Sequence, residues 1–494
     1  MIDTEKIQAR RNETWRDELR KSLKAKERSG LTRVHMPELP ANYRNSKLKE
    51  EVSQGLTAEQ AVKEAQRCLD CPTPTCMSGC PVQINIPTFI KNIERGEFVE
   101  AAKVLKETSA LPAVCGRVCP QEKQCESQCV YTLKMNKEAV AIGYLERFAA
   151  DYERESGQMS IPEMEAPNGI KVAAIGSGPA GLAFAGEMAK LGYDVTVFEA
   201  LHEIGGVLKY GIPEFRLPNE IVEAEIDNMR KMGVKFEKNC IIGKTITYDD
   251  LHQMGFKGLF AASGAGLPNF MNIPGENLIG VMSANEYLTR VNLMDASNPD
   301  SDTPVQQGKR VAIIGGGNTA MDAVRTAKRL GAERAMIVYR RSEEEMPARL
   351  EEIKHAKEEG VEFLTLHNPL EYEGDDKGHV QRMLLQKMEL GEPDASGRRS
   401  PVAIKGATEW VEVDEVIVSV GVSPNPLIPS TFSGLDVARR GTIVVDQDTM
   451  QSSLPDVYAG GDIVRGGATV ILAMGDGRKA AAAMDAKIKS EKNS

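Results

Sequence analysis

The feature that most constrains the fold of this chain is a pattern of strand, glycine turn, helix and strand that occurs twice. The first copy is IKVAAIGSGPAGLAFAGEMAKLGYDVTVFEA (residues 170–200), and the second is GKRVAIIGGGNTAMDAVRTAKRLGAERAMIVYRR (residues 308–341). Each copy begins with a short apolar run, turns through closely spaced glycines and continues with helical periodicity into a second apolar run. Two such βαβ units predict two lobes, each built on a parallel sheet covered by helices.

The first glycine turn has the spacing of a dinucleotide-binding site. Gly176, Gly178 and Gly181 form G-x-G-x-x-G, which predicts a tight turn, a close backbone approach to a pyrophosphate and packing of helix on strand. The helix N-terminus offers N–H groups to phosphates, and Glu199 ends the next strand, where a carboxylate accepts hydrogen bonds from a ribose 2′-hydroxyl. A loop that only turns the chain is the alternative, and the order of strand, motif, helix, strand and acid argues against it. The predicted site residues are Gly176, Ser177, Gly178, Pro179, Ala180, Gly181 and Glu199.

The second glycine turn leads to arginines instead of an acid. Gly315, Gly317 and Ala320 form G-x-G-x-x-A, and the following strand ends in the pair Arg340 and Arg341. An arginine pair binds a 2′-phosphate through charge-assisted hydrogen bonds, whereas a carboxylate repels it. The alternative is a solvated strand end, which the position and the missing acid both oppose. The sequence therefore predicts NADP(H) at Gly315, Gly316, Gly317, Asn318, Thr319, Ala320, Arg340 and Arg341.

A stretch near the C-terminus supplies a carboxylate after a short strand. In YAGGDI (residues 458–463), Gly461 and Asp462 suit a loop that binds the ribityl hydroxyls of FAD, although Asp462 alone would be an ordinary turn residue. The following GATVILAMGDG begins a helix whose N-terminus would face the flavin and stabilise negative charge on its reduced form. Two nucleotide sites with different ribose-binding ends predict one tightly bound FAD and one exchangeable nicotinamide.

Eight of the 9 cysteines lie in two closely spaced groups, called bursts below, between residues 68 and 129. The first burst reads C-x2-C-x4-C-x3-C-P within residues 67–81, and the second reads C-x3-C-x5-C-x3-C over residues 115–129. Zinc is the main alternative ligand, but it favours paired C-x2-C knuckles, and only one such pair is present. Closely spaced thiolates followed by proline are typical of iron–sulfur clusters. We therefore predict two cubane clusters, which move single electrons where hydride chemistry moves two.

Composition and charge predict a cytoplasmic protein. Its net charge is −10, and the charged N-terminus MIDTEKIQARRNETWRDELRK lacks the apolar core of a signal peptide. No apolar run reaches membrane-spanning length, and nothing suggests nucleic-acid binding, so neither a membrane nor a nucleic acid is an expected partner. Disulfides do not persist in the cytoplasm, which argues against a disulfide framework.

We expect helices over residues 57–68, over 86–108 with a break at Gly96, and over 139–157.

Eight stretches of the chain, taken together, resemble one known family. They are RCLDCPTPTCMSGCPVQINIP, LPAVCGRVCPQEKQCESQC, IGYLERF, IGSGPAGL, EIGGVLKYGIPEFRLP, GGGNTAMDAVRTA, YRRSEEEMPAR and AGGDIVRGGATVILAMGDGRKAA. In combination they resemble the small (beta) subunit of NADPH-dependent glutamate synthase, over residues 35–485. The same module resembles the large subunit of NADH-dependent ferredoxin:NADP oxidoreductase and the N-terminal half of dihydropyrimidine dehydrogenase.

The expected fold class is α/β, with a helical double [4Fe-4S] domain before two Rossmann-like domains of the disulfide-reductase kind. We expect the helical domain at residues 1–165, the FAD-binding domain at 166–284 plus 421–494, and the NADPH-binding domain at 285–420. For FAD the resemblance adds Gly206, Leu208 and Arg216 beside the flavin and Thr469 near its isoalloxazine ring. The alternative for the first three is a surface loop rich in glycine and proline.

The resemblance also implies two sets of cluster ligands. One cluster takes Cys68, Cys71, Cys76 and Cys129. The other takes Cys80, Cys119, Cys125 and a non-cysteine ligand, which in this sequence is Glu146 and in some relatives is Gln. Cys115 is then a spectator, although spacing alone would make it a ligand. The isolated Cys240 is expected to be a small buried hydrophobe.

The function implied by the resemblance is that of an NADPH-oxidising electron-input flavoprotein. NADPH gives a hydride to FAD, and electrons leave singly through two [4Fe-4S] clusters to a glutamate synthase large (alpha) subunit, or to another electron-accepting flavoprotein or ferredoxin-linked subunit. The alternatives are the large subunit of an electron-bifurcating NADH-dependent ferredoxin:NADP oxidoreductase and a non-catalytic iron–sulfur scaffold. No acid or base is assigned, and the absence of a C-x-x-C pair in residues 308–420 argues against disulfide chemistry.

Overall fold

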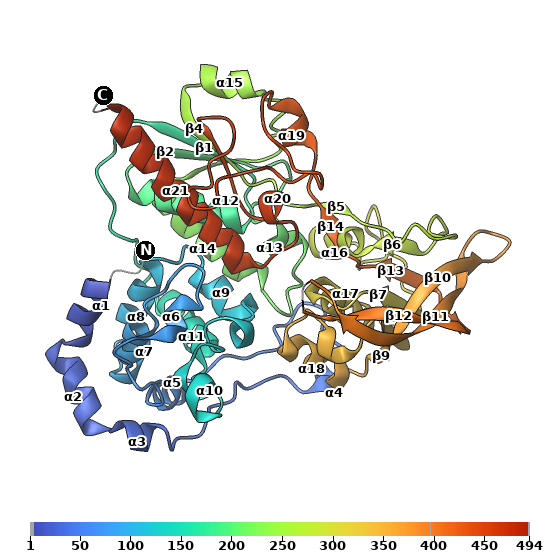
Figure 1. The fold of residues 1–494 in the computed structure, drawn as a ribbon, viewed down its shortest axis with the longest axis horizontal. Coiled ribbons are helices and arrows are strands. Elements are labelled where there is room, and N and C mark those ends of the chain that lie inside the picture. Colours follow the sequence, from blue (N-terminus) through green and yellow to red (C-terminus); the bar gives the residue numbers. More distant parts are fainter. Residues whose placement is uncertain (1–3, 396, 493–494) are drawn as a thin grey trace.

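The computed structural model describes residues 4–395 and 397–492 and arranges them as a helical domain beside two lobes, each with its own sheet (Figure 1). The helices of the first 155 residues, blue to cyan in Figure 1, lie below the first lobe and beside the second. The long C-terminal helix crosses the first lobe diagonally above the helical domain. Among the described residues, no helix combines the length and the apolar character that crossing a membrane requires.

The helical domain confirms the helices expected from periodicity and capping. α5 (Ala58–Ala65) begins with the expected capping box, in which the Gln60 N–H donates to the Thr57 hydroxyl at 3.2 Å. α7 (Ile86–Glu94) and α8 (Phe98–Lys106) are separated at Gly96, whose φ is 84°. α11 (Ile142–Glu155) ends just before Gly157. The other elements are α1 (Thr4–Arg11), α2 (Thr14–Ser22), α3 (Ala25–Arg28), α4 (Ala41–Arg44), α6 (Thr75–Ser78), α9 (Pro112–Val118), η1 (Gln121–Lys123) and α10 (Val130–Met135).

The first lobe contains a five-stranded parallel sheet in the order β15-β4-β1-β2-β3. The first βαβ unit lies within it, β3 and β4 come from the segment that follows this unit, and β15 comes from near the C-terminus. The strands are β1 (Lys171–Ile175), β2 (Asp194–Phe198), β3 (Lys235–Glu237), β4 (Phe256–Ala261) and β15 (Val457–Ala459). The helices are α12 (Pro179–Lys190), α13 (Val207–Tyr210), α14 (Asn219–Lys231), α15 (Tyr248–Gln253), α19 (Leu427–Thr431), α20 (Asp462–Arg465) and α21 (Val470–Lys492).

Close packing of α21 on α12 fixes the end of the chain against the first glycine turn. A Cβ atom added at Gly477 would lie 2.4 Å from the Ala180 carbonyl oxygen, so only glycine permits this approach. Phe184 of α12 also stacks on Phe260 of β4 with ring centroids 4.6 Å apart. Helix α21 therefore joins the helix that begins at the glycine turn to the loop that carries Asp462.

The second lobe has a similar parallel sheet, with strands in the order β6-β13-β7-β8-β9, but its edge strand β6 precedes the βαβ unit whereas β15 of the first lobe follows it. Its strands are β6 (Val281–Ser283), β7 (Arg310–Ile314), β8 (Arg334–Tyr339), β9 (Glu362–Thr365) and β13 (Glu415–Val418). Its helices are α16 (Ala284–Leu293), α17 (Asn318–Arg329), η2 (Glu343–Glu345) and α18 (Leu350–Glu358). Strand β6 lies within the segment 166–284 assigned above to the FAD-binding domain, yet it pairs with β13 of the second sheet.

An antiparallel sheet that the sequence analysis did not anticipate is inserted between β9 and β13. Its strands are β10 (His367–Gly374), β11 (Val380–Pro393) and β12 (Arg399–Glu412), in the order β10-β11-β12. It projects from the second lobe at the right of Figure 1. A short pair, β5 (Leu267–Pro268) with β14 (Val422–Ser423), joins the two chain crossings between the lobes.

Candidate functional site

One cleft of about 1840 Å³ contains both glycine turns. A pocket for one small ligand typically has a volume of roughly 300–1,000 Å³, so this cleft has room for two nucleotides. Val118 and Pro120, on either side of Cys119, line it as well, so the cysteine-rich domain reaches its wall. Of the nucleotide-site residues predicted above, all line the cleft except Gly181, Leu208 and Ala320, which are buried behind it.

The three glycines of the first turn have three different surroundings. A Cβ at Gly176 would lie 2.5 Å from the Ala262 carbonyl oxygen, and one at Gly181 would lie 2.0 Å from the Gly176 carbonyl oxygen. Gly178, in contrast, has no atom within 4 Å of such a Cβ, and it lines the cleft. Gly176 and Gly181 thus allow the turn and the helix packing, while Gly178 leaves the open space that a pyrophosphate needs.

The Glu199 carboxylate is fixed in the cleft wall by backbone and hydroxyl donors. Ser177 donates to Glu199 Oε2 from its N–H at 2.9 Å and from its hydroxyl at 2.5 Å, and the Leu201 N–H donates to Oε1 at 2.8 Å. The side chain is buried at the end of β2. The acid is therefore held in one orientation at the strand end where a ribose would lie.

Asp462 and Asp476 organise the glycine–aspartate loop of the first lobe. Burial raises the pKa of Asp462 to about 6, the Ala468 N–H opposes this rise, and the nearby Asp476 adds to it. Asp476, buried in α21, accepts from the Gly461 N–H at 3.0 Å and from Arg465 at 2.7 and 2.6 Å. Thr469 precedes α21, and its hydroxyl accepts from the Leu472 N–H at 3.4 Å. Asp476, which the sequence analysis missed, thus holds the loop that carries Asp462.

The second glycine turn is close-packed on both sides. A Cβ at Gly315 would lie 2.2 Å from the Ser419 carbonyl oxygen, and one at Gly316 would lie 2.8 Å from the Tyr339 ring. At Gly317 the nearest atom is a Pro347 carbon at 4.0 Å, which leaves space on the cleft side. Asn318 begins α17 and accepts from the Arg349 N–H at 2.9 Å. This turn has the same division of roles among its glycines as the first.

Arg340 and Arg341 line the cleft at the end of β8, but their surroundings differ. The Arg340 side chain is exposed, and among the described residues it has no hydrogen-bonding or ion-pairing partner. Arg341 is buried; its Nε donates to the Arg399 carbonyl at 2.8 Å and its guanidinium pairs with Asp394 at 2.6 Å. Only Arg340 therefore has a guanidinium that is uncommitted within the described chain.

Arg216 bridges the two lobes. It lines the cleft, as Asp322 does, and its guanidinium donates to both Asp322 carboxylate oxygens at 2.7 and 2.8 Å. Its Nε lies 3.1 Å from Glu352. Burial outweighs Arg216 and raises the pKa of Asp322 to about 6. Although burial favours the neutral acid, Arg216 and Arg325 together hold the pKa of Glu352 well below its usual range.

The cysteines of the first proposed cluster lie close enough to affect one another electrostatically. Burial raises the pKa of Cys71 to about 11, and the neighbouring Cys68 and Cys129 add to the rise. Burial likewise raises the pKa of Cys76 well above its ordinary value, with Cys68, Cys129 and Cys71 contributing. Cys68, Cys71 and Cys76 are half-buried, whereas Cys129 is buried. A bound cation would offset the burial that here favours neutral thiols.

The second set of thiols surrounds a buried acid. Burial raises the pKa of Cys80 to about 12, and Glu146 and Cys119 add to the rise. The pKa of Cys125 is raised mainly by burial, and the neighbouring Cys80 and Glu146 add to the rise. Glu146 itself is buried, which raises its pKa to about 8, and its Oε1 has no hydrogen-bond partner in the described chain. A buried carboxylate oxygen without a partner, among thiols, fits a metal ligand.

Within the described chain, the cysteine sulfurs form no group of three or more that all lie within 4.8 Å of one another. Four thiolates at 2.3 Å from one zinc ion would lie only about 3.8 Å apart. Among the described residues, the one group of potential ligands whose atoms all lie within 4.8 Å of one another is Glu38, His355 and Glu358, which contains no cysteine. Arg44 and Lys354 pair with these acids, so that group is a charge network.

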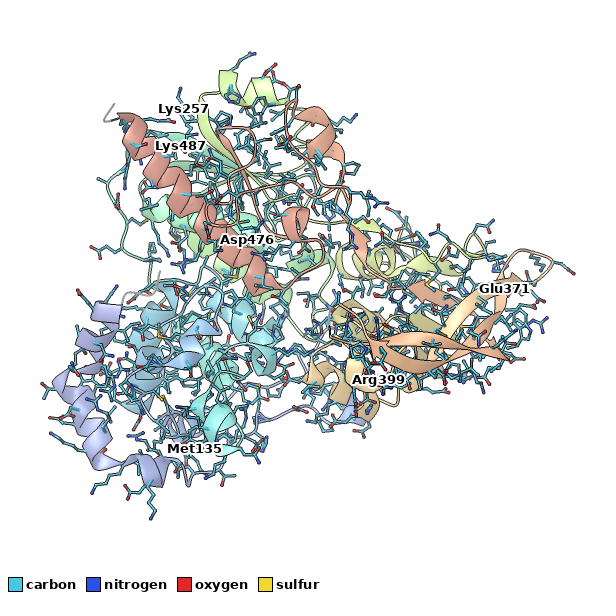
Figure 2. All side chains as sticks on the ribbon, in the orientation of Figure 1. Met135, Lys257, Glu371, Arg399, Asp476 and Lys487 are labelled. Carbon is cyan, nitrogen blue, oxygen red and sulfur yellow. The ribbon has the colours of Figure 1, made fainter. Side chains whose placement is uncertain are left out.

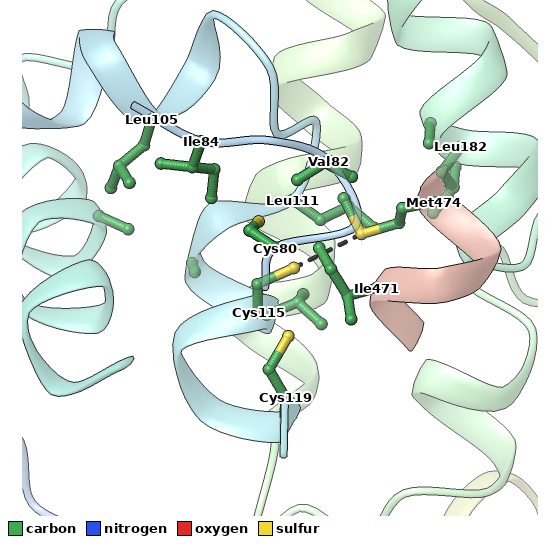
Figure 3. Packing of buried hydrophobic residues seen from close by; sticks show 14 of the residues in the cluster. Cys80, Val82, Ile84, Leu105, Leu111, Cys115, Cys119, Leu182, Ile471 and Met474 are labelled. Atoms are coloured by element: carbon green, nitrogen blue, oxygen red, sulfur yellow. Dashed lines mark hydrogen bonds between the residues drawn. The ribbon is translucent and has the colours of Figure 1, made fainter. Parts of the chain in front are cut away.

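Cys115 lies between the cysteine-rich domain and α21. Its sulfur is 3.5 Å from the Met474 sulfur, in a fully buried apolar layer (Figure 3). Leu111 and Ile471 lie in the same layer, which joins α9 to α21. Cys115 therefore already has a packing role at the interface between the helical domain and the first lobe. Cys240, expected to be buried, is half-buried at the edge of the cleft.

Comparisons with known proteins agree with this arrangement. Residues 44–158 match the family model "dihydropyrimidine dehydrogenase domain II, 4Fe-4S cluster", and residues 170–477 match "pyridine nucleotide-disulphide oxidoreductase". The chain is 37% identical over 457 residues to the glutamate synthase [NADPH] small chain of Escherichia coli, covering 91% of this chain and 96% of that one. It is 37% identical to the beta subunit of an NADP(+)-dependent formate dehydrogenase of Moorella thermoacetica, covering 84% of this chain and 60% of that one.

A likeness to solved structures supports the fold alone. FprA from Mycobacterium tuberculosis, solved in complex with NADPH, aligns with a TM-score of 0.55 at 20% identity, covering 66% of this chain and 86% of that one. This alignment supports the expected α/β fold with two Rossmann-like lobes.

Proposed function

The chain belongs to the family of the glutamate synthase [NADPH] small chain, and we propose that it supplies the electrons for L-glutamate synthesis by a large-subunit partner. It is an NADPH-dependent oxidoreductase whose cofactors are FAD, NADP(H) and [4Fe-4S] clusters. The observation that carries the proposal is the single cleft, lined by both glycine turns and by Val118 and Pro120 beside Cys119. In this proposal NADPH is oxidised in the cleft, and the electrons leave through the cysteine-rich domain that lines the same cleft.

The residues of the cleft bind and orient the two nucleotides. When bound, FAD accepts a hydride from NADPH, and the clusters carry electrons one at a time. In the proposal Gly178 admits the FAD pyrophosphate, Glu199 binds its adenosine ribose and Asp462 binds its ribityl chain. Gly317 admits the NADPH pyrophosphate, and Arg340 binds the 2′-phosphate. The proposed cluster ligands remain the two sets Cys68, Cys71, Cys76, Cys129 and Cys80, Cys119, Cys125, Glu146.

The relatives that this chain matches over nearly their whole length support a glutamate synthase partner. The chain covers 96% of the Escherichia coli small chain and 90% of the Azospirillum brasilense small chain. The partner would approach where the thiols are least buried. Cys71 and Cys76 are half-buried, and Pro72, Thr73 and Thr75 between them are exposed, whereas Cys80, Cys119 and Cys125 are buried. We propose a cytoplasmic location for the complex.

Reconstitution with a glutamate synthase large subunit tests this proposal. We expect NADPH-dependent glutamate formation by the mixture and none by either chain alone, while the small chain alone reduces ferricyanide. The matched control is the Gly178→Val variant, whose added side chain occupies the open space beside the first turn, and which should support neither reaction. If the mixture makes no glutamate although the small chain reduces ferricyanide, the proposed partner is wrong and the NADPH chemistry stands.

A further inference from the structure

The inserted antiparallel sheet reaches the cleft through the turn between β11 and β12. This turn places Arg398 in the cleft wall together with Arg340 and Arg341 of the second lobe. Figure 2 shows the neighbouring Arg399 at the inner end of the sheet, while Glu371 lies toward the end that projects away from the molecule. The turn therefore brings a cation from a separate element to the end of β8.

The turn is held in place by Arg341. The Arg341 Nε donates to the Arg399 carbonyl at 2.8 Å, and its guanidinium pairs with Asp394 at 2.6 Å. One side chain therefore binds both sides of the turn. The Arg399 side chain donates to the Leu390 carbonyl at 2.8 Å and to the Gly391 carbonyl at 3.2 Å within the sheet. Arg341 is buried by these contacts, which leaves Arg340 exposed beside the turn.

The charges around this end of the cleft favour an anion. Asp394 is neutralised by Arg341, and Glu409 pairs with Lys387 at 3.0 Å and with His367 at 3.0 Å. Asp394 at the turn and Glu409 further along β12 thus each have a basic partner. Arg340 and Arg398 add positive charge from two different elements, which suits a dianionic phosphate that can accept hydrogen bonds on several oxygens.

We propose that Arg398, carried by the turn between β11 and β12, binds the 2′-phosphate of NADPH together with Arg340, and that Arg341 is a positioning residue that holds the turn. This inference rests on the proposed location of the 2′-phosphate at the end of β8. It assigns a role in cofactor specificity to the inserted sheet, which lies outside both glycine motifs. NADH lacks the phosphate, so the contribution of Arg398 is expected for NADPH alone.

Steady-state kinetics with ferricyanide as acceptor test the inference in the full holoprotein. In Arg398→Ala we expect the KM for NADPH to rise about 10- to 100-fold, the effect of losing one charge-assisted hydrogen-bonding group, with kcat and the KM for NADH unchanged. Arg398→Lys keeps the charge and should recover part of the loss. Arg399→Ala is the matched control, because Arg399 follows Arg398 at the start of β12 and the variant keeps the carbonyl that Arg341 uses. It should leave both KM values unchanged.

Inhibition by adenosine 2′,5′-bisphosphate and by AMP gives a second readout, which reports binding of the 2′-phosphate in a ligand that carries no nicotinamide. Arg398→Ala should weaken the bisphosphate about 10-fold or more and leave AMP unaffected. Arg341→Met should act through the turn, so adding it to Arg398→Ala should produce little further loss. A full additional loss would overturn the positioning role of Arg341.

The variants also separate this inference from the proposed function. If Arg340→Ala weakens NADPH selectively and Arg398→Ala does not, the role of Arg398 is wrong and the location of the 2′-phosphate stands. If neither variant discriminates NADPH from NADH, the proposed location falls and the inference falls with it. Equal rises in the KM for NADPH and NADH in Arg398→Ala would likewise overturn it, because they would show a general distortion of the cleft.

Discussion

Replacing Arg216 by Met breaks a buried charge network between the two lobes. Arg216 contacts Asp322 at 2.7 and 2.8 Å and Glu352 at 3.1 Å, and the exposed fractions of the three side chains are only 6, 4 and 5%. Removing one partner of a buried ion pair costs about 3–5 kcal/mol, because the other charge stays buried without compensation. Glu352 keeps Arg325 as a partner, so Asp322 carries most of this loss.

The loss should depend on pH in a defined direction. Burial already raises the pKa of Asp322 to about 6, and removing Arg216, which lowers it, must raise it further. A carboxyl group whose pKa is raised by folding favours the folded state while protonated, and this contribution disappears as the pH rises through the folded-state pKa. The variant should therefore be closest to the wild type near pH 5 and furthest from it near pH 8.

Denaturation followed by circular dichroism at several pH values measures this effect. At pH 8 we expect Arg216→Met to lose about 3–5 kcal/mol, and Asp322→Asn in the same background to restore a large part of it. Arg334→Met is the control, because its pair with Glu362 is 41% exposed on both sides and should contribute less than about 1 kcal/mol. The reasoning fails if Arg216→Met costs under about 1 kcal/mol at pH 8, or if its deficit grows on acidification.

Three further predictions concern the cofactors. Glu146→Ala should lower the iron content from about eight to about four atoms per chain, while Cys115→Ala should leave it unchanged. Iron analysis of anaerobically purified protein measures both, and the reverse result would make Cys115 the ligand. Gly178→Ala should abolish FAD retention without lowering the melting temperature of the apoprotein. Gly181→Ala should lower that temperature, because its Cβ would lie 2.0 Å from a carbonyl oxygen. Equal melting temperatures for the two variants would contradict these roles. Asp476→Asn weakens the contacts to Arg465 and should raise the FAD dissociation constant about 10-fold or more in fluorescence titrations; an unchanged constant would show that the loop does not need it.

The sequence predicted those parts of the structure that depend on local chemistry. The capping box of α5, the break at Gly96 and both βαβ units follow from residues within a few positions of each other, and the structure has each of them. Equivalent glycine spacings also led to equivalent turns. At both Gly176 and Gly315, an added Cβ would clash with a backbone carbonyl oxygen just after the neighbouring strand. Short-range patterns of this kind need no knowledge of the distant chain.

The features that the sequence did not predict depend on contacts between distant residues. Arg340 and Arg341 look equivalent in the sequence, but Asp394, 53 residues further on, makes Arg341 structural. Strand β12 alternates weakly and is exposed along much of its length, so its periodicity gives no clear strand signal. The one available hint for Asp476 was a charged residue in an otherwise apolar helical stretch, which is costly to bury unless it is paired.

The measurement that tests the central claim most directly is cofactor analysis of the chain purified without oxygen, followed by titration with NADPH. The account predicts about eight iron atoms, as many acid-labile sulfides and one FAD per chain, with the flavin absorbance bleached rapidly by NADPH. It also predicts that this bleaching is followed by electron delivery to a one-electron acceptor at about two equivalents per NADPH. Protein that contains zinc in place of iron, or that binds no flavin, would contradict the account.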